Sequence, residues 1–456
     1  MEKSFVLSAV GQADDTVLLS NDIFKLQLIL QLALNFCKKF DIKLNPTKTK
    51  LLVVPPARNP KFFVPHNPVN IDGTPVEIVD QTEHVGVLRS SSGNLPNILQ
   101  RITSFKNAMR PLLSCGLARG SRSNPVASIK ILSIYATPVL VSGLGSLVLT
   151  KSEFSSLDQQ YKRTLQNLLK LSVNSPQSLV YFVAGSLPLS AIIHQRMLSL
   201  FMMICHLPAD PLHSFACHTL LTASPSSISW IMQVRNLLLQ YHLPHPMDLL
   251  VHPPSKTVFK RLVESKITDF WENKLRCEAA PVLSKSLRYF RPQFLSLKSP
   301  HRILQSAGSK PYEVAKTIIQ LKFMSSQFNC GHRTQHWSPN NPEGLCTFPA
   351  CFSMGHIETP EHILLYCPAY SEKRETLLNI SLKNLVSNGL AVQFLGSSET
   401  TNSIQFLLDP TTIPEVIRAS QIHGDYVIND ILYLGRTWCF SLHRERLKRL
   451  CLWNFS

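Results

Sequence analysis

This sequence lacks several features that mark whole classes of protein. Its apolar N-terminal run, Phe5 to Val10, is shorter than the core of a signal peptide, so we predict no secretion signal. Its eleven cysteines are an odd number scattered over 456 residues, unlike the dense disulfide framework of small secreted domains. We find no internal repeat. We therefore expect a globular protein of the nucleus or cytoplasm.

A clear transmembrane segment is also lacking. Residues 131–150 hold no charge over a membrane-spanning length. However, Pro138, Gly143 and Gly145 interrupt the stretch, and basic segments flank it on both sides. We expect a buried helix followed by a turn, and no membrane partner.

Acidic residues are scarce relative to basic ones. The chain has 29 Asp and Glu against 46 Lys and Arg, a formal net charge of +17. This excess favours a polyanionic partner, nucleic acid first and an anionic membrane second. Residues 101–170 alone hold ten Lys or Arg against two acidic residues, a net +8. A hydrophobic content of 44% predicts sizeable folded cores.

The first ninety residues have the pattern of a small α/β unit. Two β-prone runs, SFVLSAV and TVLLS, meet at residues 11–15 and predict a hairpin. Asn21 or Asp22 then caps a helix that continues to about Lys39. A turn at Asn45-Pro46 leads into a strand, and Asp72-Gly73 marks a second hairpin. The predicted helix has apolar residues on one face: Phe24, Leu28, Leu32 and Phe36.

From about residue 95 the periodicity becomes helical. Residues 206–320 are rich in Pro, His and Ser, with helical pieces such as 229–243 whose role we do not assign. Residues 433–453 predict a strongly basic amphipathic helix. In residues 156–172, Leu157, Tyr161, Leu165 and Leu168 share one side of a helix, with the candidate nucleic-acid-binding residues Lys162, Arg163 and Lys170 outside.

Asp14 and Asp15 form the first candidate site. Two adjacent carboxylates at a tight turn raise each other's pKa, and a divalent cation such as Mg²⁺ resolves the repulsion. Nucleotidyl transfer uses such ions to activate a hydroxyl and to stabilise the leaving phosphate. A solvated Asp-Asp turn is the commoner meaning of the bare dipeptide.

A second candidate site has the spacing of metal ligands, Cys346-x4-Cys351-x10-His362-x4-Cys367. Three thiolates and one imidazole make a closed tetrahedral Zn²⁺ site of the structural type, which leaves no open position for catalysis. Such a site stabilises a small fold with little core of its own. The alternative is free cysteines beside a buried histidine, and His356 competes with His362 as the fourth ligand.

Basic residues follow this second site. Lys373 and Arg374 come directly after it and are candidates for phosphate contact. The predicted terminal helix has a charge run that is either a solvated face or a salt-sensitive phosphate-binding face. The basic residues of that run are Arg444, Arg446, Lys448 and Arg449, against Glu445.

The order of these motifs resembles reverse transcriptases of LINE-type (non-LTR) retrotransposons. The ADD hairpin, long helix and LNPTKTKLLVV segment resemble their polymerase palm, and ET-x-x-H-I-L-L-x-C-P resembles their downstream cysteine–histidine motif. The resemblance implies that Asp14 and Asp15 descend from Mg²⁺-binding carboxylates. It also implies that Lys48 descends from the lysine facing the nucleotide phosphates, although without the family Lys48 is an ordinary surface lysine. Gln12 stands where the family has an aromatic residue.

The expected fold class is mostly α with a small α+β N-terminal unit. The resemblance divides the chain into a truncated reverse-transcriptase palm (1–92), a helical basic thumb-like region (93–205), a helical linker region (206–320), a zinc-knuckle-like CCHC domain (321–375) and a helical basic tail (376–456).

We therefore expect the C-terminal fragment of a LINE-type reverse transcriptase that binds RNA or DNA. Because the chain starts at the ADD hairpin, the fingers and a third metal-binding aspartate lie outside it, and we expect no autonomous polymerase activity. A non-catalytic, zinc-containing nucleic-acid-binding protein of transposon origin and a decayed reading frame are the alternatives. Residues 376–456 lack the Pro-Asp signature of the nuclease that some relatives carry, since Asp409-Pro410 has the reverse order.

Overall fold

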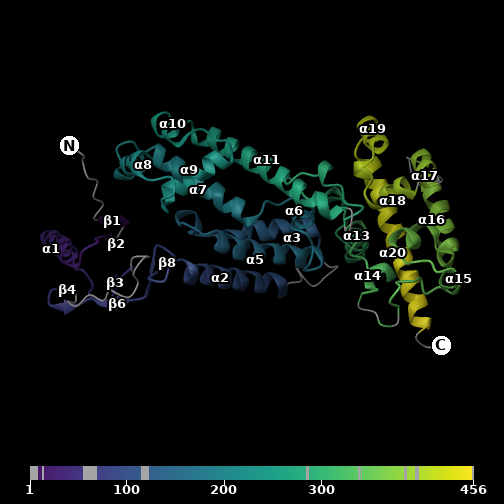
Figure 1. Ribbon diagram of the computed structural model, residues 1–456, viewed down its shortest axis with the longest axis horizontal. Helices are drawn as coiled ribbons and strands as arrows, with labels where there is room; N and C mark the ends of the chain where they lie inside the picture. The colour runs from purple at the N-terminus through teal and green to yellow at the C-terminus, as the bar shows by residue number, and fades with distance from the viewer. Residues whose placement is uncertain are drawn as a thin grey trace. The chain divides into compact units, whose positions relative to one another are not determined.

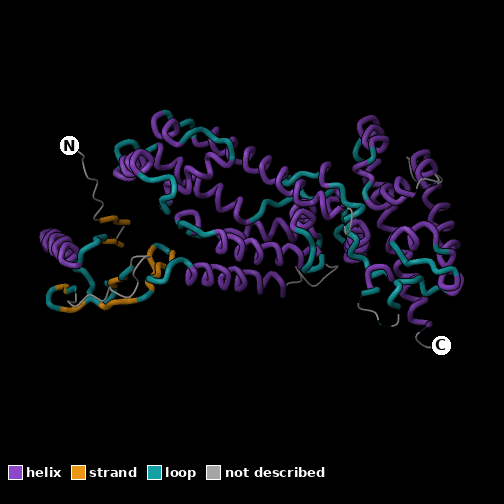
Figure 2. Tube along the Cα trace, in the orientation of Figure 1, coloured by secondary structure: helices purple, strands orange, loops and turns teal. Residues whose placement is uncertain are grey.

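The computed structural model of the chain describes residues 9–12, 15–54, 69–114, 123–283, 287–336, 339, 341–384, 388–395 and 400–453. Most of these residues are helical, and the strands all lie before residue 91 (Figure 2). The expectation of a mostly α fold with a small α+β N-terminal part is confirmed at this level.

The chain forms two compact units, each assembled from three stretches. One contains residues 1–107, 137–158 and 189–267, and the other contains residues 108–136, 159–188 and 268–456. The helices between residues 93 and 205 contribute to both units. The division into five consecutive segments stays a prediction.

The described strands form four two-stranded ladders. The predicted first hairpin is confirmed, with Gln12 opposite Asp15 at its turn. The predicted turn at Asp72-Gly73 is confirmed as well, since both residues have positive φ (45° and 85°), as a type I′ turn requires. The pairs are β1 (Ala9–Gln12) with β2 (Asp15–Leu18), β3 (Lys50–Leu52) with β6 (Glu77–Val79) in parallel, β4 (Asn70–Ile71) with β5 (Thr74–Pro75), and β7 (Gln81–His84) with β8 (Val87–Ser90).

Helix α1 (Ile23–Lys39) begins as predicted at Asp22, whose carboxylate accepts the backbone N–H groups of two first-turn residues. Its buried face differs from the expected one. Leu30 and Leu34 pack into a small core with Val69, Ile71 and Val76. The four apolar residues expected on one face stay exposed, namely Phe24, Leu28, Leu32 and Phe36.

The four exposed residues lie four apart and together cover about 120° of α1, so they share one face as predicted, but this face is not the one that packs. The orientation of α1 is fixed instead by Gln27, whose side-chain amide exchanges two hydrogen bonds (3.1 and 2.9 Å) with the backbone of Asn70.

Several predictions for the middle of the chain are confirmed. Residues 125–141 are helical and end just before Gly143, which has φ +72°, so the uncharged stretch is a helix followed by a turn. One face of this helix is buried, whereas Ile134 and Tyr135 are exposed. The apolar side of the helix at 151–169 is buried as predicted. The elements are α2 (Leu95–Ser114), α3 (Pro125–Ile131), a π-helical stretch (Leu132–Ala136), α4 (Thr137–Val141), a 3-10 turn (Leu144–Ser146), α5 (Lys151–Leu169), α6 (Gln177–Ala184), α7 (Leu189–Cys205), α8 (Pro211–Thr222), α9 (Trp230–Gln240), α10 (Pro246–Val251) and α11 (Lys256–Leu283).

Among the described helices, none is long and apolar enough to cross a membrane by itself. Helices α6 and α7 meet the criteria of length and composition only as a pair, with a bend of 64° between them.

The long helix α20 (Tyr426–Trp453) is the axis of the C-terminal part and confirms the predicted terminal helix. It packs along α13, α18 and α19 (Figure 1). Gly435 allows the close approach, since a Cβ there would lie 2.0 Å from the Leu407 carbonyl oxygen. The other elements are 3-10 turns at Pro292–Phe294, Pro368–Tyr370 and Pro410–Thr412, a π-helix at His362–Tyr366, and α12 (Arg302–Gln305), α13 (Pro311–Met324), α14 (Gly331–Thr334), α15 (Pro349–Ser353), α16 (Ser371–Asn384), α17 (Asn388–Leu395), α18 (Thr400–Leu408) and α19 (Pro414–His423).

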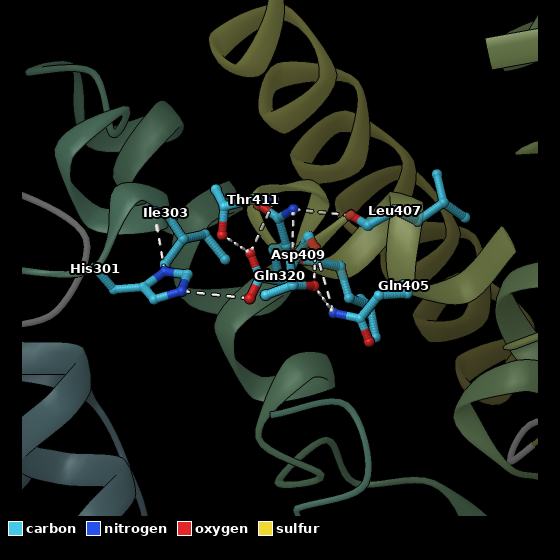
Figure 3. A network of polar contacts seen from close by, with 9 residues as sticks. His301, Ile303, Gln320, Gln405, Leu407, Asp409 and Thr411 are labelled. Atoms are coloured by element: carbon cyan, nitrogen blue, oxygen red, sulfur yellow. Dashed lines mark hydrogen bonds and ion pairs between the residues drawn. The ribbon is translucent and has the colours of Figure 1, made fainter. Parts of the chain in front are cut away.

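A buried polar network fixes the corner between α18 and α19 (Figure 3). His301 Nδ1 accepts the backbone N–H of Ile303 at 3.1 Å, and its Nε2 faces the Asp409 carboxylate at 3.4 Å. Thr411 donates its backbone N–H to the same carboxylate. Burial opposes ionisation of Asp409, but His301 and Thr411 outweigh it and lower the pKa of this carboxyl. The network therefore ties α12 to the corner.

Candidate metal centre

The four predicted ligands Cys346, Cys351, His362 and Cys367 come together. Their ligand atoms all lie within 4.8 Å of one another, and all four residues are buried. The Cys367 Sγ lies 3.8 Å from the Sγ atoms of both Cys346 and Cys351. A tetrahedral ion with Zn–S bonds of about 2.3 Å separates two sulfur atoms by about 3.8 Å. The sulfur spacing therefore fits Zn²⁺.

The imidazole of His362 also has the environment of a metal ligand. Its Nε2 is buried and has no hydrogen-bond partner within the described residues. A buried nitrogen without a hydrogen bond destabilises the folded state by about 1–3 kcal/mol, and a bond to a metal would offset this loss. His356 is exposed and stacks on the His362 ring with the centroids 5.7 Å apart. His362, and not His356, lies with the three thiols, as the sequence predicted for the fourth candidate ligand.

A tight turn positions the first two ligands. Pro349 occupies the first turn of the short helix α15, which carries Cys351. The chain then returns through Gly355, whose φ of +69° suits glycine, and His356 donates its N–H to the Cys351 carbonyl at 2.9 Å. Cys346 donates its own N–H to the His356 carbonyl at 2.8 Å. This loop therefore holds the thiols of Cys346 and Cys351 close to the Sγ atom of Cys367.

A π-helical turn positions the other two ligands. The Cys367 N–H donates to the His362 carbonyl five residues earlier, at 2.7 Å. The wider π turn brings the side chains of residues five apart to the same side of the helix. Arg374 donates to the Cys367 carbonyl at 2.8 Å, and its burial lowers the pKa of the guanidinium. Arg374, a candidate for phosphate contact, thus supports the ligand segment.

The thiols have strongly divergent proton affinities because they are so close. The contact with Cys367 lowers the pKa of Cys346 to about 4, and the nearby imidazole of His362 adds to the effect. The same contact with Cys346 raises the pKa of Cys367, and burial raises the pKa of Cys351. Three thiolates at this spacing need a cation between them, and a divalent ion removes the mutual repulsion.

An ion pair joins the ligand segment to α20. The Glu358 carboxylate, 3% exposed, accepts two hydrogen bonds from the Arg446 guanidinium, each 2.8 Å long. It also accepts the Gly331 backbone N–H at 2.7 Å. Gly331 itself touches the backbone of Gly344, where an added Cβ would lie 2.4 Å from the carbonyl oxygen. Arg446, a candidate for nucleic-acid contact, therefore has a structural partner that sequence reasoning missed.

The first candidate site is less organised. Asp14 lies outside the described residues, and Asp15 is exposed at the start of β2. Lys48 is exposed in a turn that the Asn45 side chain closes by accepting backbone N–H groups, including that of Lys48 at 3.3 Å. Within the described residues, no carboxylate group of three or more gathers at Asp15. Mg²⁺ binding and the catalytic roles of Asp14, Asp15 and Lys48 stay predictions.

The remaining basic candidates vary in exposure. Arg163 and Arg444 are exposed, whereas Lys162, Lys170 and Lys373 are partly buried. Lys448 and Arg449 both lie close to Glu445, at 3.8 and 3.3 Å. Part of the charge run on α20 is therefore neutralised by its own glutamate.

No model of a known protein family matches the chain, and comparisons with curated proteins and with solved structures give no match. The fold and the site by themselves define a mostly helical protein with a buried Cys3His centre that fits Zn²⁺.

Proposed function

We propose that the chain is the C-terminal part of a LINE-type reverse transcriptase, and that it binds RNA or DNA through a region organised by a structural zinc ion. The Cys3His centre is the observation that carries the proposal. Its ligands have the spacing and the position after the ADD hairpin that the resemblance requires, and their sulfur spacing of 3.8 Å fits the metal.

The chemistry of the centre favours binding over catalysis. The four buried side chains would fill all positions around a tetrahedral ion and would leave none for water or substrate. The ion would instead hold together a segment of short turns, between residues 341 and 370, that has few strands or long helices. Nearby basic side chains would then be free to contact phosphate.

The overall charge supports a nucleic-acid partner. A net charge of +17 attracts polyanions over long distances and makes the binding sensitive to salt. Arg163 and Arg444 are exposed cations of the second unit that can contact phosphate directly. The inherited polymerase chemistry would use Asp14 and Asp15 to hold Mg²⁺ and Lys48 to protonate the leaving phosphate.

A non-catalytic nucleic-acid-binding protein of transposon origin is the second candidate. The exposure of Asp15 favours it, because a two-metal centre needs several carboxylates held around shared ions. Both candidates include zinc and nucleic acid, and they differ only in polymerase activity.

The test uses the full chain purified without chelator. We expect one equivalent of zinc by elemental analysis, and binding to labelled single-stranded RNA and DNA that weakens steeply between about 50 and 200 mM salt. Absence of binding at the lowest salt would overturn the proposal. Primer extension on an RNA template, lost in Asp14→Ala and Asp15→Ala, would select the polymerase; binding without extension would select the second candidate.

A further inference from the structure

Two exposed tyrosine rings share one buried ammonium group where α13 packs against α20. Tyr312 lies in the first turn of α13 and Tyr433 lies on α20, and each residue is 51% exposed. The Lys316 Nζ lies 4.6 Å from the centre of the Tyr312 ring and 5.3 Å from the centre of the Tyr433 ring. Both distances are within the range of a cation–π contact, about 6 Å. Because Lys316 is only 6% exposed, the half of each ring that faces solvent lies away from it.

The packing of the two helices sets the positions of these rings. Tyr312 and Lys316 are four residues apart on α13 and therefore lie on one face of that helix. Tyr433 and Phe440 are seven residues apart on α20, which also places them on one face. The Phe440 ring meets the Tyr312 ring at a centroid distance of 5.0 Å and an angle of 85°. The fold therefore holds both tyrosine rings in place before any ligand binds.

Two cations and one anion lie close to the rings. Lys316 forms an ion pair with Glu313, in which Nζ and Oε1 are 2.9 Å apart. The guanidinium carbon of Arg436 lies 5.9 Å from the centre of the Tyr433 ring, and its Nη1 donates to the Ser306 hydroxyl at 3.0 Å. Arg436 is 5% exposed, so its charge is poorly screened by water. These three charged groups together are positive, which favours a polyanion at the exposed side of the rings.

The exposed surface of the two helices indicates which kind of polyanion fits. Aromatic rings combined with cations bind single-stranded nucleic acid, because every base has a flat π-face that stacks on a ring. A partner helix would instead need a groove for its aliphatic side chains. Among the described side chains of α13 and α20, the exposed large hydrophobic ones are three tyrosines and one leucine, namely Tyr312, Tyr426, Tyr433 and Leu447. This surface therefore suits bases better than an apolar helix.

We propose that Tyr312 and Tyr433, with Lys316 between them, form a stacking platform for the bases of a single-stranded RNA or DNA. The inference rests on the proposed function and names the surface that takes the bases. Stacking tolerates every base, so the platform binds without a preference for sequence. Phosphate contacts elsewhere supply the part of the affinity that weakens with salt, and stacking supplies a part that does not.

The first test replaces the rings in the full chain. Tyr312→Leu and Tyr433→Leu keep an apolar side chain and should each weaken binding of a single-stranded RNA about tenfold. The slope of log affinity against log salt should stay the same, because no charge is removed. Tyr433→Phe keeps the ring and should bind within about twofold of the natural chain. The control Tyr135→Leu replaces an exposed tyrosine of the same unit away from α13 and α20, and should also stay within about twofold.

The second test separates bases from phosphates. It compares a single strand of about 16 thymidines with an abasic strand of the same length and charge. The natural chain should bind the thymidine strand about tenfold more tightly, whereas the double variant Tyr312→Leu/Tyr433→Leu should bind both strands equally. Equal binding of the two strands by the natural chain would overturn the platform and leave the proposed function standing. No binding of either strand at the lowest salt would overturn both.

Thermal unfolding and sedimentation detect two other roles of this surface. If the leucine variants unfold at a lower temperature and lose affinity for the thymidine and abasic strands alike, the rings only hold α13 against α20 and the proposal is wrong. If the natural chain self-associates and Tyr433→Leu abolishes that association without changing the preference for the thymidine strand, the rings contact a second copy of the chain, and the proposal is wrong as well.

Discussion

The Cys3His centre and the ADD hairpin are both motifs of metal-ligand residues, but their surroundings differ. Cys346, Cys351, His362 and Cys367 are buried, and turns and hydrogen bonds fix each of them before any ion binds. Asp15 is exposed at the edge of a two-stranded ladder. A buried donor set without a cation is costly, so its existence is itself a sign of the metal. An exposed carboxylate is solvated by water and needs no cation, so the exposure of Asp15 does not indicate a bound metal.

The largest expected effect is the loss of bound zinc when a residue of the Cys3His centre is replaced; no such loss is expected when a residue of the ADD hairpin is replaced. Cys367→Ser should reduce bound zinc from one equivalent to near zero and unfold residues 341–370, because structural Zn²⁺ contributes about 10–16 kcal/mol of apparent binding free energy. Elemental analysis and thermal unfolding measure both results. The exposed thiol variant Cys277→Ser and the hairpin variant Asp15→Ala should match the natural chain. Full zinc content in Cys367→Ser would contradict the assignment of the ligands.

The ion pair behind the centre should give the next largest effect. Glu358→Gln leaves the buried guanidinium of Arg446 without a counter-charge, which we expect to lower the free energy of unfolding by about 3–5 kcal/mol. Urea unfolding of the zinc-loaded chain measures the change. Glu415→Gln removes an exposed partner of Arg418 and should cost at most about 1 kcal/mol. Similar costs for the two variants would mean that the buried pair contributes no more than a surface pair.

Glycine variants compare how closely the backbone packs beside the Cys3His centre and in the ADD hairpin. Gly331→Ala forces a Cβ to within 2.4 Å of the Gly344 carbonyl oxygen and should destabilise the chain by about 1–3 kcal/mol. Gly11→Ala in β1 meets nothing closer than 3.8 Å and should change stability by less than about 0.5 kcal/mol. Unfolding in urea compares the two, and a neutral Gly331→Ala would refute the close contact.

The smallest effect is a pH dependence from His443. Burial, with Arg446 and Lys322, lowers the pKa of His443 in the folded chain, so the folded state resists protonation. Its stabilising contribution is complete above the unfolded pKa of about 6.5 and declines as the pH falls below that value. The change, on the order of 1 kcal/mol or less after solvent screening, should vanish in His443→Gln and persist in His423→Gln. Stability measured from pH 7.5 down to about 5 decides this, and an unchanged profile in His443→Gln would exclude the effect.

Local signals in the sequence were enough to predict much of the fold and the metal centre. The cap at Asp22 and the turn at Asp72-Gly73 depend on neighbouring residues only. The grouping of the four candidate metal ligands could be predicted from their spacing, because cysteine and histidine at such intervals have few other uses. The buried stripe on α5 followed from helical periodicity.

Contacts between distant residues could not be predicted in this way. The buried face of α1 depends on the pairing of Gln27 with Asn70, which lies 43 residues further along the chain. The charge run of α20 predicted either a solvated face or a phosphate-binding face, yet Arg446 is largely buried and pairs with Glu358.

The pairing of Glu358 with Arg446 has a consequence for folding during synthesis on the ribosome. The two residues are 88 positions apart, and the arginine is made last. At about 5–20 residues per second, a ribosome needs roughly 4–18 s to make the intervening chain. During that interval the ligand segment has its thiols and its imidazole but not the guanidinium that neutralises Glu358. All four candidate ligands are therefore made before the fold can be completed, and a nascent chain that stops before Arg446 lacks the ion pair behind them.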